Sequence, residues 1–146
     1  MISEVPFTLD RWKNVRLQPE QEHEPPTPEY AERLVSEGVT WAYDDADGHT
    51  IAVGGLYPVG PGQAVAWTYL GCDSGPYILA LVRAMKRAMD AHKNRWPVLR
   101  ASVLKDFAAG QRLMALLGFV PLLGTEPIAF RARIYLVYQK VHYGGH

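Results

Sequence analysis

The stretch "LGCDSGPYILALVRAM", residues 70–85, constrains the fold most, because the chain passes there from a β-rich run into an amphipathic helical pattern. The preceding run "AVAWTYLG" predicts a strand. After the loop, Ile78, Val82, Met85 and Met89 fall on one stripe at helical spacing. The next β-rich run is "WPVLRASVL". Two strands joined by a crossover helix predict a parallel βαβ pairing.

Upstream elements are marked by strong local signals. In "EHEPPTPEYAERLVSEG", Thr27 offers a hydroxyl cap, Pro28 suits the first helical position, and Gly38 is a natural stop, which predicts a short helix. The runs "VTWAYDD" and "IAVGGLY" flank an Asp-Gly turn and predict a β-hairpin. The turn "PVGPGQ" then leads into "AVAWTYLG". These three strands are expected to form an antiparallel meander.

Downstream, Asp106 is expected to cap a helix over "FAAGQRLMALLG", which Gly118 ends. The run "RARIYLVYQKV" predicts a long final strand. The expected order is helix, three strands, helix, strand, helix, strand. This order predicts an α/β or α+β fold with a mixed sheet, and the length of 146 residues predicts a single domain, 1–146.

Composition narrows the class of protein. A hydrophobic share of 48% and a charged share of 21% are typical of a globular domain. Fifteen basic and fifteen acidic residues balance, so no overall field attracts nucleic acid or an anionic membrane. No membrane-spanning run or signal peptide is recognisable, and a single cysteine excludes an intrachain disulfide. We therefore expect a cytoplasmic protein without nucleic-acid or membrane partners.

The element order, together with the helix–Gly-Phe–strand piece "QRLMALLGFVPL", resembles the GNAT acetyltransferase superfamily, especially the short GNAT-like proteins of bacteriophages. The resemblance in element order covers residues 39–141. It implies a mixed, mostly antiparallel sheet with a central, splayed parallel strand pair and flanking helices. It also implies an N-acetyltransferase that moves acetyl from acetyl-CoA to a primary amine of a small molecule or protein, in a bacterial or phage-infected cell.

The resemblance also implies a place for acetyl-CoA, in the gap between the two parallel strands. The third strand would face the pantetheine arm, and the loop after it would place the pyrophosphate at the start of the crossover helix, where free N–H groups favour anions. The cofactor-binding residues implied are Trp67, Leu70, Gly71, Cys72, Asp73, Ser74, Gly75 and Tyr77.

The sequence departs from the family pattern in and beyond this loop. "GCDSGPY" lacks the usual basic residue, Asp73 adds a negative charge, and Pro76 has no N–H. On the alternative interpretation, Asp73 or Ser74 only caps the helix. Met114 and Phe107 stand where the family often has a tyrosine acid and an asparagine.

Because methionine cannot donate a proton, the acid would have to be water or another side chain such as Tyr69. The alternative function is a catalytically silent GNAT-fold structural or interaction protein, a homo-oligomer or a component of a phage particle or its assembly. No metal site is expected.

Several other groups carry weaker signals. Cys72, beside a helix start, is a candidate nucleophile or simply a small apolar residue. The turn "DDADG" is expected to be solvated rather than to bind a cation, and "VHYGGH", with His142 and His146, to be a polar tail. "EQEHE" is expected to be a solvated loop, or to offer carboxylates near a cleft. Four aromatic residues on neighbouring predicted strands are expected to form cross-strand pairs or the walls of the groove: Trp41, Tyr43, Trp67 and Tyr69.

Overall fold

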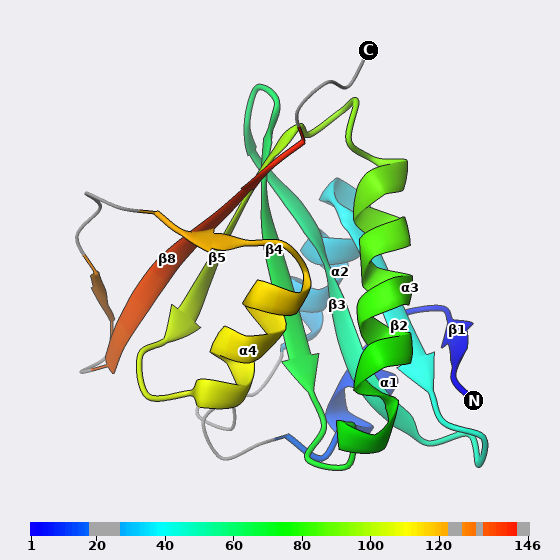
Figure 1. Cartoon of the computed structure of the whole chain (residues 1–146). Coiled ribbons are helices and arrows are strands. Elements are labelled where there is room, and N and C mark those ends of the chain that lie inside the picture. The colour runs from blue at the N-terminus through cyan, green and yellow to red at the C-terminus, as the bar shows by residue number, and fades with distance from the viewer. Residues whose placement is uncertain (18–26, 123–126, 131–132, 143–146) are drawn as a thin grey trace. The chain divides into compact units, whose positions relative to one another are not determined.

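The structure is a computed structural model, and it describes residues 1–17, 27–122, 127–130 and 133–142 (Figure 1). "EQEHE" and His146 lie outside these ranges. The strands are β1 (Ser3–Val5), β2 (Val39–Asp44), β3 (Thr50–Gly60), β4 (Gln63–Leu70), β5 (Val98–Leu104), β6 (Val120–Pro121), β7 (Ile128–Phe130) and β8 (Arg133–Val141). The helices are α1 (Leu9–Asn14), α2 (Pro28–Glu37), α3 (Ile78–Ala91) and α4 (Ala108–Leu116), and a 3₁₀ turn, Gly75–Tyr77, precedes α3.

The sheet is mixed and mostly antiparallel, as predicted. Its strand order is β1-β2-β3-β4-β5-β8-β6, with β7 paired to β8. The predicted parallel pair is confirmed: Gln63–Val65 of β4 pairs in parallel with Val98–Arg100 of β5. The predicted splay of these two strands stays a prediction. No helix in the described part of the chain has the length and apolar character needed to cross a bilayer.

The chain divides into two compact units. Unit 1 comprises Met1–Tyr57 and Ala66–Ala84, and unit 2 comprises Pro58–Val65 and Met85–His146. Unit 1 therefore contains β1, β2, most of β3, the second half of β4 and the start of α3. Unit 2 contains the turn between β3 and β4, the rest of α3, and all elements from β5 to β8.

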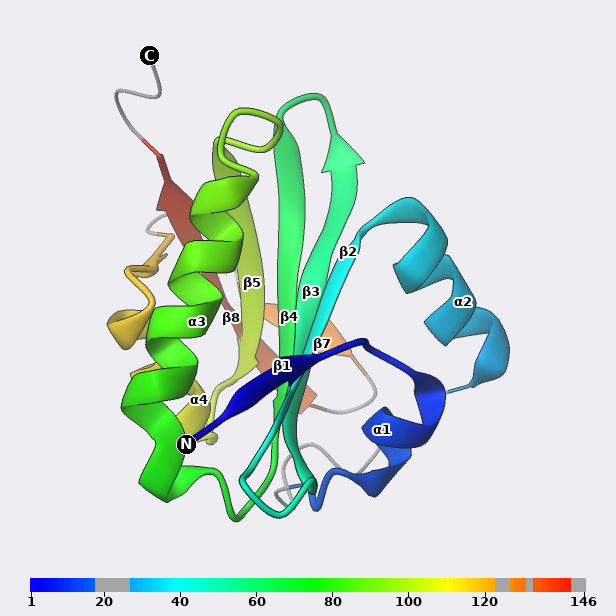
Figure 2. The same cartoon turned by 90° about the vertical axis from the view of Figure 1, so that its right-hand side faces the viewer.

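In unit 1, α1 and α2 cover one face of the strands (Figure 2). Trp12 and Val15 of the α1 segment and Leu34 of α2 are buried against Ala42 of β2 and Val53 of β3. The predicted cap of α2 is confirmed, since the N–H of Tyr30 donates to the Thr27 hydroxyl at 3.2 Å. The predicted hairpin is confirmed by the antiparallel pairing of β2 and β3.

Two features of unit 1 differ from expectation. The expected order began with α2, whereas β1 and α1 precede it, with the Thr8 hydroxyl capping α1. The helix stop at Gly38 is correct, but its φ of −125° is not left-handed. A Cβ on Gly38 would lie 2.3 Å from the Leu56 carbonyl oxygen, so glycine is required there by close packing of α2 on β3.

Unit 2 is built around β8, which pairs antiparallel with β5 from Val98↔Val141 to Leu104↔Tyr135 and also with β6 and β7. Figure 1 shows β8 running alongside β5, with α4 beside them. The helix stop predicted at Gly118 is confirmed by its φ of +90°. The Nζ of Lys140 donates to the Leu117 carbonyl at 2.7 Å and so satisfies the end of α4.

One prediction for unit 2 is wrong, and the position of one histidine was not foreseen. Asp106 does not cap α4, because the N-cap residue is Phe107, and no side chain makes the capping hydrogen bond. His142, expected in a polar tail, has a side chain that is only 8% exposed, and its Nδ1 lies 3.5 Å from Oδ1 of Asp90. Burial lowers the pKa of His142, Lys140 lowers it further, and Asp90 opposes both effects.

Candidate functional site

The loop after β4 is anchored to the rest of unit 1 at its first two residues. The N–H of Gly71 donates to the carbonyl of Ile51 at 2.7 Å, and the N–H of Cys72 donates to the carbonyl of Arg16 at 2.7 Å. A Cβ on Gly71 would lie 2.5 Å from Oδ1 of Asp73 and 3.0 Å from the Ile51 oxygen, so the close approach requires glycine. The predicted phosphate loop is therefore held in one place by tertiary contacts.

Further along the loop, more N–H groups are used internally. The N–H of Ser74 donates to the Gly71 carbonyl at 3.1 Å, and the N–H of Tyr77 donates to the Ser74 carbonyl at 2.9 Å. The N–H of Ile78 donates to the Gly75 carbonyl. The last two of these bonds form the 3₁₀ turn that leads into α3.

Two N–H groups of the loop are not taken up by these bonds, those of Asp73 and Gly75. Pro76, the next residue, has no N–H to offer. Gly75 is exposed, and a Cβ built on it would meet nothing within 4 Å. An anion at this loop would therefore be held by two N–H groups, fewer than a fully open helix N-terminus presents.

The capping interpretation of this loop is wrong for Ser74. Its hydroxyl donates to the Gly71 carbonyl at 2.7 Å and makes no capping bond to the helix. Ser74 is 3% exposed, so its hydroxyl is an internal brace of the loop. The first turn of α3 is consequently entered through the 3₁₀ turn and without a side-chain cap.

The carboxylate of Asp73 lies beside a histidine. Its Oδ2 lies 3.3 Å from Nε2 of His49, and the two side chains are 30% and 28% exposed. His49 comes from the turn between β2 and β3, and no local pattern in the sequence predicts its position beside residue 73. The charge of Asp73 is the main electrostatic obstacle to an anion at this loop.

Trp67 and Tyr69, which alternate along β4, lie on the face covered by α1 and belong to an aromatic cluster. The ring centroid of Trp12 is 5.7 Å from that of Trp67 and 5.1 Å from that of Tyr69. Phe7 packs against Trp67 edge-on at 5.7 Å. Tyr69 is half-buried in this cluster, and its role as an acid stays a prediction.

The remaining predicted site residues lie elsewhere around the end of β4. Leu70 is 4% exposed, and strand alternation places it on the opposite face from Tyr69. Cys72 carries an exposed free thiol. Tyr77 is half-buried in the 3₁₀ turn. The structure thus brings Trp67 and Tyr69 together and separates them from Leu70.

The predicted pairing of Trp41 and Tyr43 with the β4 aromatics is wrong. A Cβ on Gly54 would meet the Trp41 indole, whereas a Cβ on the next residue, Gly55, would meet the Trp67 ring. Successive residues of a strand face opposite sides of a sheet, so Trp41 and Trp67 lie on opposite faces. The aromatic residues of β2 and those of β4 therefore cannot line the same wall of a groove.

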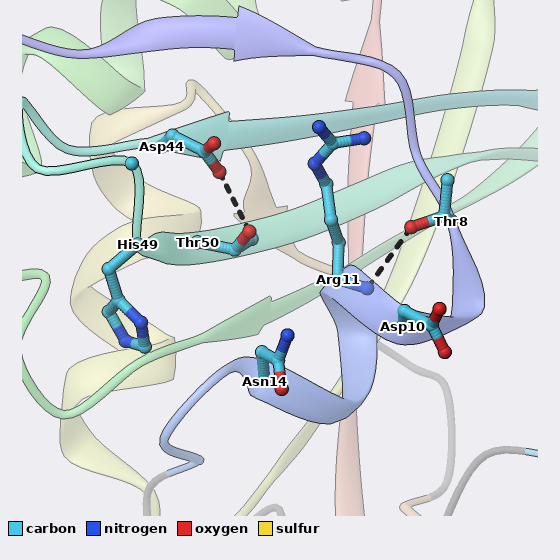
Figure 3. Close-up of a pocket in the computed structure, with 8 residues that line it drawn as sticks. Thr8, Asp10, Arg11, Asn14, Asp44, His49 and Thr50 are labelled. Carbon is cyan, nitrogen blue, oxygen red and sulfur yellow. Dashed lines mark hydrogen bonds between the residues drawn. The ribbon is translucent and has the colours of Figure 1, made fainter.

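A polar cavity in unit 1 was not anticipated from the sequence. Its volume is about 490 Å³, and its walls include Asp10, Arg11 and Asn14 of α1. The hairpin contributes Asp44, His49 and Thr50 (Figure 3). Two stretches of the sequence contribute to it: the run "TLDRWKN", which Thr8 caps, and the acidic turn, for which the sequence predicts only a solvated segment.

That acidic turn is organised by its own backbone. Oδ1 of Asp45 accepts the N–H of Asp47 at 2.9 Å and that of His49 at 3.0 Å. Gly48 completes the turn with a φ of +81°. These bonds fix His49 between the loop after β4 on one side and the polar cavity on the other.

Comparison with known proteins gives a clear result for the fold. No protein-family model matches the chain, and no curated protein matches it either. Solved structures of N-acetyltransferases do match. One from Staphylococcus aureus Mu50 has a TM-score of 0.73 at 12% identity, covering 97% of this chain and 98% of that one.

Two further N-acetyltransferase structures match the chain. The ribosomal-protein-S18-alanine N-acetyltransferase of Escherichia coli has a TM-score of 0.69 at 14% identity, covering 95% of this chain and 92% of that one. A variant of the spermidine N-acetyltransferase of Vibrio cholerae has a TM-score of 0.65 at 11% identity, covering 97% of this chain and 94% of that one. The chain therefore has the GNAT fold, as the resemblance implied.

Proposed function

We propose that this protein is an N-acetyltransferase that transfers acetyl from acetyl-CoA to a primary amine of a small molecule or a protein. The observation that carries the proposal is the match to N-acetyltransferase structures over almost the whole of both chains. Fold alone permits many activities, so the loop after β4 supplies the second support.

The loop would hold the pyrophosphate of acetyl-CoA through the N–H groups of Asp73 and Gly75. The exposed Gly75 leaves room for a phosphate to approach the backbone. The Asp73 carboxylate lies 3.3 Å from Nε2 of His49, so it has a polar neighbour within the protein. The loop is fixed by Ile51 and Arg16, so little reorganisation would be needed on binding.

The chemistry of the transfer is simple. The amine nitrogen attacks the thioester carbon, the carbon–sulfur bond breaks, and the proton that the amine loses balances the one that the CoA thiolate gains. Bringing the two reactants together supplies much of the rate enhancement in such reactions. In this chain the proposed roles are pyrophosphate binding by the loop, and proton donation by Tyr69 or by water.

A second candidate function is a catalytically silent GNAT-fold protein with a structural or interaction role, in a phage particle or its assembly. Met114 is 6% exposed within α4, and Phe107 is 6% exposed at its start. Both positions, where the family often has polar groups, are thus occupied by core side chains. This observation favours the second candidate, because neither side chain can donate a proton.

Binding of acetyl-CoA decides between the two candidates. Thermal unfolding is measured with and without millimolar acetyl-CoA, and release of CoA thiol is followed with a panel of primary amines. A ligand that binds only the folded state raises the free energy of unfolding by RT ln(1 + [L]/Kd). A rise in melting temperature with thiol release supports the enzyme, whereas neither change supports the silent protein.

Charge reversal in the loop tests the phosphate site itself. Asp73→Arg should tighten binding of CoA by about tenfold and leave binding of pantetheine, which has no pyrophosphate, unchanged. Glu32→Arg makes the same change of charge on the exposed surface of α2 and is the matched control. Equal effects of the two substitutions, or equal effects on CoA and pantetheine, would contradict a phosphate site at Asp73.

A further inference from the structure

The polar cavity of unit 1 contains charged groups of both signs. Arg11 and Asn14 reach it from α1, and Asp44 and Thr50 reach it from the facing ends of β2 and β3 (Figure 3). The volume of about 490 Å³ falls in the range of small-molecule sites, roughly 300–1,000 Å³. Every wall of the cavity belongs to unit 1.

Asp44 is the most unusual group in the cavity, because it is only 9% exposed. Its Oδ1 accepts a hydrogen bond from the Thr50 hydroxyl at 2.7 Å. Within the described residues, no cationic side chain lies within 4 Å of its carboxylate. Burying a carboxylate is costly unless it is paired, and one hydroxyl is a weak partner for it. A cationic group in the cavity would complete the site.

Arg11 supplies the opposite charge. Its Nη1 donates to the Pro6 carbonyl at 2.8 Å, and this bond fixes the guanidinium beside the cavity. A guanidinium has five N–H donors in a planar fork that suits a carboxylate. Asn14 adds an amide that can also donate. An anionic group in the cavity would therefore find donors on the α1 side.

We propose that this cavity binds a small zwitterion of the free α-amino acid type, with its ammonium group at Asp44 and its carboxylate at Arg11. A simple anion is disfavoured, because Asp44 and Asp10 outweigh the single guanidinium. A simple cation would leave the charge of Arg11 without an anionic partner, because its hydrogen bond to Pro6 is to a neutral carbonyl. A molecule carrying both charges satisfies both walls.

The proposal does not depend on acetyl-CoA or on acetyl transfer. None of the groups invoked belongs to the loop after β4, and binding is measured with the full chain in the absence of acetyl-CoA. Failure of the acetyltransferase proposal would therefore leave this one intact, and the reverse also holds.

The first test is a thermal-shift screen of the standard L-amino acids, followed by calorimetry on the best binder. At roughly tenfold excess over Kd, the melting temperature should rise by about 4 °C. The carboxamide of the same amino acid lacks the carboxylate, and its N-acetyl form lacks the ammonium group. Each should bind at least about tenfold more weakly. Absence of binding by every amino acid, or equal binding of either derivative, would overturn the proposal.

The second test assigns the binding to the cavity. Asp44→Asn keeps the size of the side chain and an acceptor for Thr50 but removes the charge, and should weaken binding by about tenfold or more. Arg11→Gln on the half-buried Arg11 should do the same, and it decides the question should Asp44→Asn fail to fold. Asp47→Asn, on an exposed carboxylate outside the cavity, is the control and should bind as the parent does. Unchanged binding in Arg11→Gln would refute the site.

Discussion

Trp12 connects α1 to the strands, and its replacement by alanine tests whether this contact stabilises unit 1. The side chain is 2% exposed and contacts the rings of Phe7, Trp67 and Tyr69. A buried tryptophan removes about 200 Å² from water, which at about 25 cal/mol per Å² amounts to about 5 kcal/mol.

The indole N–H of Trp12 reduces this contribution to stability. The Nε1 of Trp12 is buried and has no hydrogen-bond partner among the described residues. A buried, unsatisfied donor costs about 1–3 kcal/mol, so Trp12→Ala should lower the free energy of unfolding by about 3 kcal/mol. Trp12→Phe removes the unsatisfied N–H and keeps a ring, so it should lie within about 1 kcal/mol of the parent.

The measurement is urea unfolding followed by far-ultraviolet circular dichroism, because tryptophan fluorescence changes with the substitution itself. Leu79→Ala, at a side chain that is 62% exposed, is the control and should change stability by less than about 0.5 kcal/mol. A loss below about 1 kcal/mol for Trp12→Ala would refute the argument, because α1 would then contribute little to the stability of the folded unit.

Three other predictions concern stability. Gly55→Ala should lower the free energy of unfolding by about 2 kcal/mol, because the new Cβ would lie 2.3 Å from the Val39 carbonyl oxygen. Gly75→Ala should be nearly neutral, because a Cβ there meets nothing within 4 Å, and thermal unfolding compares the two variants. Thr27→Ala removes the cap of α2 and should cost about 1 kcal/mol in urea unfolding, and an unchanged midpoint would contradict this. His142 has a pKa lowered by burial, so the unfolded chain binds the proton more tightly, and stability should fall as the pH drops below the ordinary value of 6.5. His142→Asn should reduce that slope in a series of melts from neutral to acidic pH.

The fold could be predicted from the sequence where signals are local or follow from chain order. The hairpin around Gly48, the cap at Thr27 and the helix end at Gly118 each depend on a few neighbouring residues, and all three are present. The parallel pairing of β4 with β5 followed from the crossover helix between them. β1 and α1 were missed because three and six residues carry too little periodicity to be recognised.

The candidate site could be predicted less well, because it depends on contacts between distant segments. No sequence rule places His49 beside Asp73, or directs the N–H groups of Gly71 and Cys72 to Ile51 and Arg16. Which face of the sheet Trp41 and Trp67 occupy likewise depends on strand register. A shift of one residue moves every side chain of a strand to the other face. The role proposed for Asp44 rests on its burial, which no local signal in the sequence predicts.

The position of β8 has a consequence for synthesis of the chain on the ribosome. β8 is translated after β5, β6 and β7, yet all three of them pair with it. Until residues 133–141 have left the exit tunnel, these earlier strands present unsatisfied edges that can associate with other nascent chains. Truncations that end before β8 should therefore accumulate as aggregates, whereas complete chains can close unit 2 in a single late step.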